Sequence, residues 1–141
     1  MGKTNKVRLT VRDDNGNHLQ AAHVEVLGCD YEGADLSGLS YIAQKGLRGK
    51  CFRHSILYWA NLSDSDFSGC DFRGADLRGA VLMGTNLSDC DFRGANLGND
   101  QMGGETQIDG ANFEGSIYDR STVFPEGYSP KTAQMQYQEN S

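Results

Sequence analysis

The chain lacks the features that mark several common classes of protein. No apolar run in its 141 residues is long enough to cross a membrane, and its N-terminus has no apolar stretch of the secretory type. Positive charge is scarce, with 13 Lys and Arg against 19 Asp and Glu. This balance argues against direct nucleic-acid binding. We therefore expect one cytoplasmic domain without membrane or nucleic-acid contacts.

Catalytic motifs are also missing. The three histidines, His18, His23 and His54, are scattered, and no Ser-His-Asp, Cys-His or phosphate-loop arrangement is present. The spacing of the four cysteines is unlike that of a zinc motif. We expect no enzymatic activity, no cofactor and no bound metal.

What the chain does have is an apolar residue at every fifth position, from Val26 to Val123. Single-residue skips interrupt the series in 43–46 and in 103–107. A fixed short period of this kind predicts a solenoid. The sites are Val26, Tyr31, Leu36, Tyr41, Leu47, Phe52, Leu57, Leu62, Phe67, Phe72, Leu77, Leu82, Leu87, Phe92, Leu97, Met102, Ile108, Phe113, Tyr118 and Val123.

The neighbours of each apolar site repeat as well. A small residue usually lies two positions earlier, Asp or Asn often lies one position earlier, and Gly is frequent two positions later. The clearest stretch, residues 60–84, reads ANLSDSDFSGCDFRGADLRGAVLMG. Over about residues 24–125 this pattern resembles the pentapeptide-repeat family, whose consensus is A(D/N)LXX. The resemblance implies an all-β fold, a right-handed quadrilateral parallel β-helix with four pentads in each coil.

A four-sided coil would stack residues that lie 20 apart, or 21 apart across a skip. One such column is aromatic throughout, and the other three are apolar, which favours four sides over three and predicts about five coils. The columns are Tyr31, Phe52, Phe72, Phe92 and Phe113; Leu36, Leu57, Leu77, Leu97 and Tyr118; Tyr41, Leu62, Leu82, Met102 and Val123; and Val26, Leu47, Phe67, Leu87 and Ile108.

The two ends of the chain lie outside the repeat. We expect residues 1–23 to form an N-terminal strand or hairpin cap, because 7–11 alternate like a strand and 13–17 are turn residues, after which 18–25 can return. Residues 24–125 would form the β-helix. Residues 126–141 would be a C-terminal cap and flexible tail, in which Ser129 and Pro130 suit the start of a short helix.

The cysteines and the breaks in the repeat carry separate expectations. We expect all four cysteines to be free thiols, with Cys70 and Cys90 filling small apolar slots of one column and Cys29 two coils from Cys70. Lys50 and Asp100 also fall on small slots, where an unpaired charge cannot stay inside, so bulged corners are expected there. Short projecting loops are expected at 40–46 and 98–104. The sequence assigns no role to the breaks at 43–46 and 98–106.

The outward positions differ between faces. An Arg ladder, Arg53, Arg73 and Arg93, runs beside Asp71 and Asp91, and we expect this face to neutralise itself rather than bind an anion. Clustered outward apolar groups predict a contact surface, which the terminal segments, a second subunit or a partner protein can cover. The candidate interaction surface is Ile42, Ile56, Tyr58, Trp59, Val81, Met83 and Phe124.

Two hypotheses for function follow. The first is a non-catalytic structural or protein-interaction module of bacterial or phage type, with an unidentified protein partner or with a second copy in a homodimer. The second comes from the family resemblance: a DNA-mimicking protein that binds a type II topoisomerase (gyrase) and modulates or protects it. The net charge of −6 fits an acidic mimic, but the Arg ladder and Arg78 interrupt any negative stripe. The first hypothesis is therefore favoured.

Overall fold

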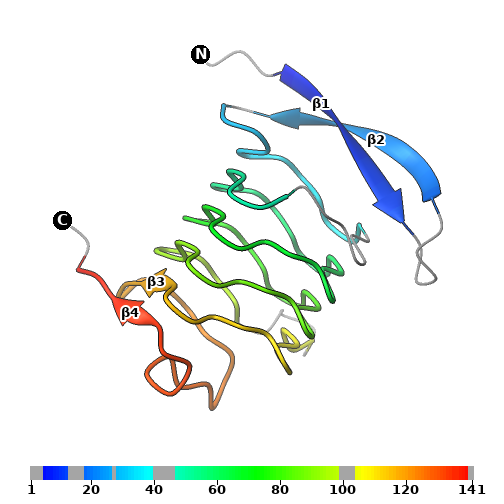
Figure 1. The fold of residues 1–141 in the computed structure, drawn as a ribbon. Helices are drawn as coiled ribbons and strands as arrows, with labels where there is room; N and C mark the ends of the chain where they lie inside the picture. Colours follow the sequence, from blue (N-terminus) through cyan, green and yellow to red (C-terminus); the bar gives the residue numbers. More distant parts are fainter. Residues whose placement is uncertain (1–4, 13–17, 27, 40–46, 99–103, 140–141) are drawn as a thin grey trace.

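The computed structural model describes residues 5–12, 18–26, 28–39, 47–98 and 104–139. Two long strands come first: β1 (Asn5–Arg12) and β2 (His18–Val26) pair antiparallel, with a bulge between Val11 and Arg12. The strands expected at 7–11 and 18–25 lie within them. Figure 1 shows this hairpin at the N-terminal end of a stack of coils.

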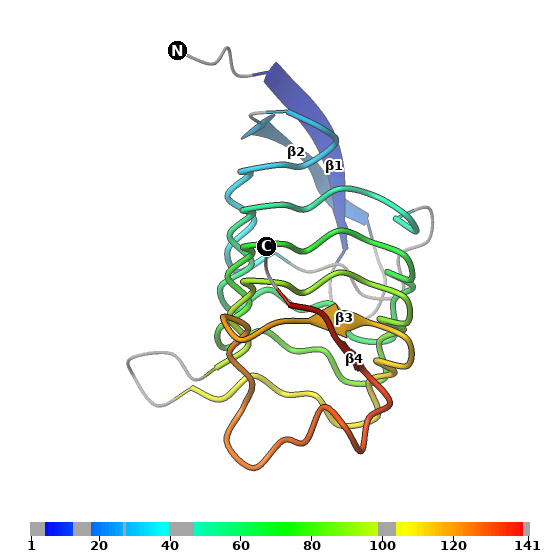
Figure 2. The same ribbon diagram turned by 90° about the vertical axis from the view of Figure 1, so that its left-hand side faces the viewer.

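The coils are joined by short parallel bridges that recur every five residues. Cys51 pairs with Asp71, Ile56 with Asp76, Asn61 with Val81, and Asp66 with Asn86. Each partner lies 20 residues further along the chain, so one coil consumes four pentads, as the columns predicted. Figure 2 shows the coils as successive layers. Each layer is held by backbone hydrogen bonds such as Phe72 N–H to Asp91 C=O, 2.8 Å.

The interior is filled by the residues of the five-residue series. Phe72 is completely buried, and its ring stacks on those of Phe52 and Phe92 with 5.3 Å between centroids in both cases. Tyr31 continues the column, 5.0 Å from Phe52. Small residues such as Ala75 fill the slots beside the large ones. This alternation of large and small groups packs the narrow tube without strain.

The Asp and Asn residues of the repeat close its turns. Asp66 Oδ1 accepts hydrogen bonds from the backbone N–H of Ser68 (3.0 Å) and from its hydroxyl (2.7 Å). Asn86 does the same for Ser88. These side chains take the amides that the turn leaves without a backbone partner, which explains why the position before an inward residue is often Asp or Asn.

The stacking register changes after Leu97, and here the predicted register is wrong. Bridges join Val81 to Gln107 and Asp91 to Ile117, a spacing of 26 where the single-residue skip predicted 21. Six residues more than a regular coil, rather than one, therefore lie between Leu97 and Ile108. Phe113 consequently follows Leu87 in the stack, and Tyr118 follows Phe92. Met102 lies outside the described residues.

Thr106 holds the base of this insertion. It is buried in a small slot, where its Oγ1 accepts a hydrogen bond from Gly79 N–H at 3.0 Å. The same hydroxyl lies 2.8 Å from Gly98 C=O and 3.1 Å from Leu77 C=O. One side chain thus ties the two ends of the inserted segment to the preceding coil, so the coil resumes in register after the extra residues.

A second change in the stacking register exchanges the inward and outward positions of Val123 and Phe124. Val123, rather than Phe124, bridges to Asn96, a spacing of 27, because a wider turn built on Asp119 and Thr122 adds one more residue. Val123 therefore points outward and is 47% exposed, whereas Phe124 packs against the core. The prediction that Val123 is inward and Phe124 outward is wrong.

The C-terminal segment covers one side of the last coil. The short strands β3 (Ile117–Tyr118) and β4 (Gln136–Tyr137) pair in parallel, and they lie side by side in Figure 1. The described residues contain no helix, so the short helix expected from Ser129 and Pro130 is replaced by a turn. A positive φ of 61° at Gln134 ends that turn, and it sends Met135 into the core.

Candidate interaction surface

Three of the predicted surface residues, one aliphatic and two aromatic, form one apolar patch. Ile56 and Tyr58 flank the buried Leu57 and so face outward, and Trp59 follows at the corner, where it is 48% exposed. The Tyr58 and Trp59 rings stack with centroids 5.0 Å apart. The Arg78 guanidinium of the next coil lies 5.5 Å from the Tyr58 centroid, a cation–π geometry.

A shallow hollow of about 350 Å³ lies beside this patch, lined by Ser37, Ile56, Tyr58, Asp76 and Arg78. The Arg78–Asp76 pair within it is bidentate, with N···O distances of 2.6 and 2.9 Å. Burial alone would raise the pKa of Asp76, but the hydrogen bonds from Arg78 hold it below its ordinary value. The hollow thus combines aromatic and aliphatic surface with a neutralised ion pair.

Of the other predicted surface residues, two lie on the outside, one lies inside, and one is not described by the structure. Val81 and Met83 flank the buried Leu82 on the adjoining side, and Met83 is 41% exposed. Phe124 does not belong to the surface, because it turns inward after the register shift. Ile42 lies outside the described residues. The structure therefore presents Ile56, Tyr58, Trp59, Val81 and Met83 as outward apolar groups, and we call these five the apolar face.

The Arg ladder is paired as expected. Arg73 lies between the Asp of its own coil and that of the next, with Nη2 2.8 Å from Asp71 and Nε 3.8 Å from Asp91. Arg93 binds Asp91 at 2.6 Å. Hydrogen bonding to these carboxylates raises the pKa of both guanidinium groups. Alternating charges of this kind leave little net field to attract an anion.

Cys70 and Cys90 fill buried slots, as predicted. Their thiols donate to Leu47 C=O (2.9 Å) and Phe67 C=O (3.0 Å) of the preceding coil. Burial raises the pKa of Cys70 to about 12 and also raises that of Cys90. Thiols held neutral in this way are poor nucleophiles, which agrees with a packing role.

Cys29 and Cys51, in contrast, form a disulfide, so the expectation of four free thiols is wrong. Their Cα atoms lie 5.8 Å apart, and the bond links residues on successive coils. Asp30 has a φ of 43° and accepts the Cys51 N–H through Oδ2 at 2.9 Å, which brings the two sulfurs together. Their separation of 22 residues is one more than the 21-residue stacking distance across the first skip. The pair does not share a column of the repeat, so a search for cysteines within one column does not find it.

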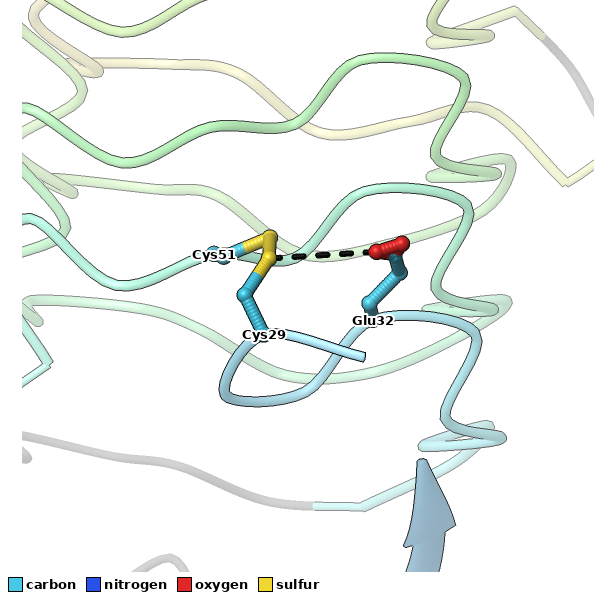
Figure 3. Close-up of side chains that lie close together, drawn as sticks. All are labelled: Cys29, Glu32 and Cys51. Atoms are coloured by element: carbon cyan, nitrogen blue, oxygen red, sulfur yellow. Dashed lines mark hydrogen bonds between the residues drawn. A yellow bond between two sulfur atoms is a disulfide. The ribbon is translucent and has the colours of Figure 1, made fainter. Parts of the chain in front are cut away.

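Glu32 and Arg53 lie against the disulfide. Figure 3 shows Glu32 beside the sulfurs, with Oε1 3.8 Å from Cys29 Sγ. Arg53 approaches Cys29 Sγ to 3.1 Å through Nη2 and Cys51 Sγ to 3.4 Å through Nε. The sulfur and carboxylate atoms lie within 4.8 Å of one another, a spacing that a metal ion could bridge. The S–S bond uses both sulfurs, however, and the guanidinium places a positive charge among them, so the cluster does not suit a cation as it stands.

Comparisons with a family model and with solved structures point to the same family, the pentapeptide-repeat proteins. A family model for pentapeptide repeats matches residues 60–99 with eight copies. A pentapeptide repeat protein from Nostoc Pcc 7120 is 26% identical over 74% of this chain and 84% of its own, with a TM-score of 0.39. One from Cyanothece 51142 is 28% identical over 64% of this chain and 60% of its own, with a TM-score of 0.37.

A further solved structure is QnrB1, a plasmid-mediated fluoroquinolone resistance protein. It is 18% identical over 81% of this chain and 80% of its own, with a TM-score of 0.30. No curated protein matches the chain. Within the described residues, no helix has the length and apolar character needed to span a membrane.

Proposed function

Because this chain belongs to the pentapeptide-repeat proteins, we propose that it is a non-catalytic, cytoplasmic module that binds a protein partner through the apolar face. The observation that carries the proposal is the exposure of Trp59, stacked on Tyr58 with Arg78 over the tyrosine ring. Trp, Tyr and Arg are the residue types that dominate binding energy at protein interfaces.

The energetics favour this face over the Arg ladder. Burial of apolar surface contributes roughly 25 cal/mol per Å². Exposed ion pairs contribute only ~0–1 kcal/mol each, and they are already made within the chain. A partner that covered the ladder would also have to desolvate its charges. The partner is therefore expected to present an apolar or aromatic group to the hollow beside Tyr58.

Site-specific photo-cross-linking tests the proposal. A cross-linker in place of Met83 should give a discrete adduct, either with a second copy or with a partner from the source cells. Position 88 is the matched control, because Ser88 follows Leu87 on the next side just as Met83 follows Leu82. Equal adducts from positions 83 and 88 would contradict the proposal.

A substitution in the patch makes the same test independent of the cross-linker. Trp59→Asn should abolish the adduct, and Asn tolerates the φ of 59° at that corner. Asp64→Asn is its control, at a corner with a φ of 57° on the next side. Light scattering of both variants reports whether the binding partner is a second copy of the chain.

The gyrase hypothesis is the second candidate. The net charge of −6 supports it, whereas the paired Arg ladder counts against a continuous negative stripe. We expect purified protein to leave gyrase supercoiling, and its inhibition by a quinolone, unchanged. A dose-dependent effect that persists in Trp59→Asn would favour the topoisomerase hypothesis over the apolar face.

A further inference from the structure

We propose that the Cys29–Cys51 disulfide is a reversible modification site that exchanges with a small thiol such as glutathione, and that its closure fastens the first coil to the second. The disulfide is a covalent cross-link between these coils. It lies near the N-terminal end of the stack, whereas Cys70 and Cys90 lie in the following coils as buried free thiols.

Accessibility distinguishes this pair from the other two cysteines. Cys29 is reached by solvent, whereas Cys51 is only 8% exposed. An incoming thiolate therefore attacks Cys29 Sγ. Cys70 and Cys90 are 1% exposed and hydrogen-bonded to backbone carbonyls, so they do not compete in the exchange.

Arg53 supplies the chemical feature that favours exchange. Its guanidinium N–H groups point at both sulfurs, at 3.1 and 3.4 Å, so each thiolate formed on reduction has a cation beside it, closer to Cys29 Sγ than the Glu32 carboxylate at 3.8 Å. A stabilised thiolate is a better leaving group. Arg53 also lies 3.6 Å from Glu32 Oε1 and 3.5 Å from Asp71 Oδ2, but its shortest side-chain contacts are to the sulfurs. The equivalent residues of later coils, Arg73 and Arg93, make their short contacts with carboxylates. The sulfur-facing arginine therefore belongs specifically to the coil that carries the disulfide.

The exchange balances with two molecules of glutathione. The first attacks Cys29 Sγ as a thiolate, forms a mixed disulfide and breaks the S–S bond, and Cys51 leaves as a thiolate beside Arg53 Nε. The second attacks the glutathione sulfur of the mixed disulfide, releases the Cys29 thiolate beside Arg53 Nη2, and leaves as oxidised glutathione. The protein gains two electrons, the two glutathiones lose them, and oxidation is the reverse.

The structural consequence falls on a small set of hydrogen bonds. The N–H groups of Tyr31, Gly33 and Leu36 donate to the carbonyls of Cys51, Arg53 and Ile56 across the first two coils, at 2.7–2.9 Å. An end repeat has a coil on one side only and opens more readily than the middle of the stack. Reduction removes the cross-link and leaves backbone hydrogen bonds such as these, together with that from Ile56 N–H to Ala34 C=O, to hold the coil.

Hydrogen exchange in glutathione buffers tests the effect on the coil, using the full chain. The amides of Tyr31, Gly33 and Leu36 should exchange faster in the reduced protein, on the order of tenfold or more, and should recover on reoxidation. The amides of Phe72 and Leu77, in the middle of the stack, should not change. Cys29→Ser should show the fast exchange in both buffers. A disulfide that forms without slowing these three amides would refute the fastening.

Thiol-labelling mass spectrometry tests the chemistry. Cys29 and Cys51 should cycle between two free thiols and none as the glutathione ratio changes. Arg53→Gln should slow the reduction severalfold, whereas the matched Arg93→Gln should not. Equal rates in the two variants would refute the role of Arg53. A pair that stays reduced in oxidised glutathione, or a zinc ion retained by the reduced protein and lost in Cys29→Ser, would overturn the proposal.

Discussion

Replacing Phe72 by alanine would open a cavity at the centre of the aromatic column. The side chain is fully buried, its ring stacks on Phe52 and Phe92 at 5.3 Å, and Phe67 lies 6.0 Å away. Burial of a Phe side chain contributes ~1.5–3 kcal/mol. Each aromatic pair adds ~0.5–1.5 kcal/mol. The backbone cannot collapse into the gap, because Phe72 N–H and Asp71 N–H are bonded to the coils on either side.

We therefore expect Phe72→Ala to lower the free energy of unfolding by about 3–5 kcal/mol. Urea denaturation followed by circular dichroism and by the fluorescence of the single tryptophan, Trp59, measures it, and coincident transitions justify a two-state treatment. Phe72→Leu is the control, with a smaller expected loss than the alanine variant, because it keeps most of the volume and loses chiefly the ring stacking. A loss below about 1 kcal/mol for the alanine variant would refute the stacked interior.

Two further predictions concern a buried hydroxyl and the carboxylates. Thr106→Val should cost ~1–3 kcal/mol in urea denaturation, because it leaves Gly79 N–H and Gly98 C=O without their partner; a neutral effect would mean that the inserted segment is anchored elsewhere. Acid should also destabilise the protein. In the folded state the pKa values of Asp71 and Asp76 are held below their ordinary range. Their contribution to the free energy of unfolding is therefore fully present above the unfolded pKa of ~3.9, and it is lost as pH falls through the folded pKa. Thermal unfolding between neutral pH and about pH 2 should show this loss, and Asp76→Asn should shrink it; an unchanged acid profile in that variant would remove Asp76 as a cause.

The period of the sequence predicted the interior as far as Leu97, because stacking at a 20-residue interval follows directly from four pentads per coil. It failed beyond that point for a physical reason. Met102 keeps the five-residue phase, so the pattern cannot distinguish a pentad that joins the coil from one that leaves it. The hydrogen bonds of Thr106 fix where the coil resumes. They depend on contact between its hydroxyl and the Leu77 carbonyl, which is distant in sequence. Phe124 was misplaced for the same reason, since turn length and not hydropathy decides which neighbour turns inward.

The surface was predicted less completely than the interior. Alternation about Leu57 and Leu82 correctly placed Ile56, Tyr58 and Met83 outside, because neighbours of an inward residue must point away from it. The disulfide was missed because cysteines were compared only within one column. Cys29 and Cys51 lie on adjacent coils but differ by one position in the repeat, and the positive φ of Asp30 closes that gap.

The pairing of β4 with β3 has a consequence for how copies of this protein could assemble. A parallel β-helix ends in unpaired N–H and C=O groups, which can template the addition of another chain and so lead to a polymer. Here Gln136 N–H donates to Ser116 C=O and Gln138 N–H to Tyr118 C=O, so the chain's own tail takes that position on one side of the final coil. A second rod cannot add there without displacing the tail. The tail therefore hinders growth along the axis on this side of the final coil.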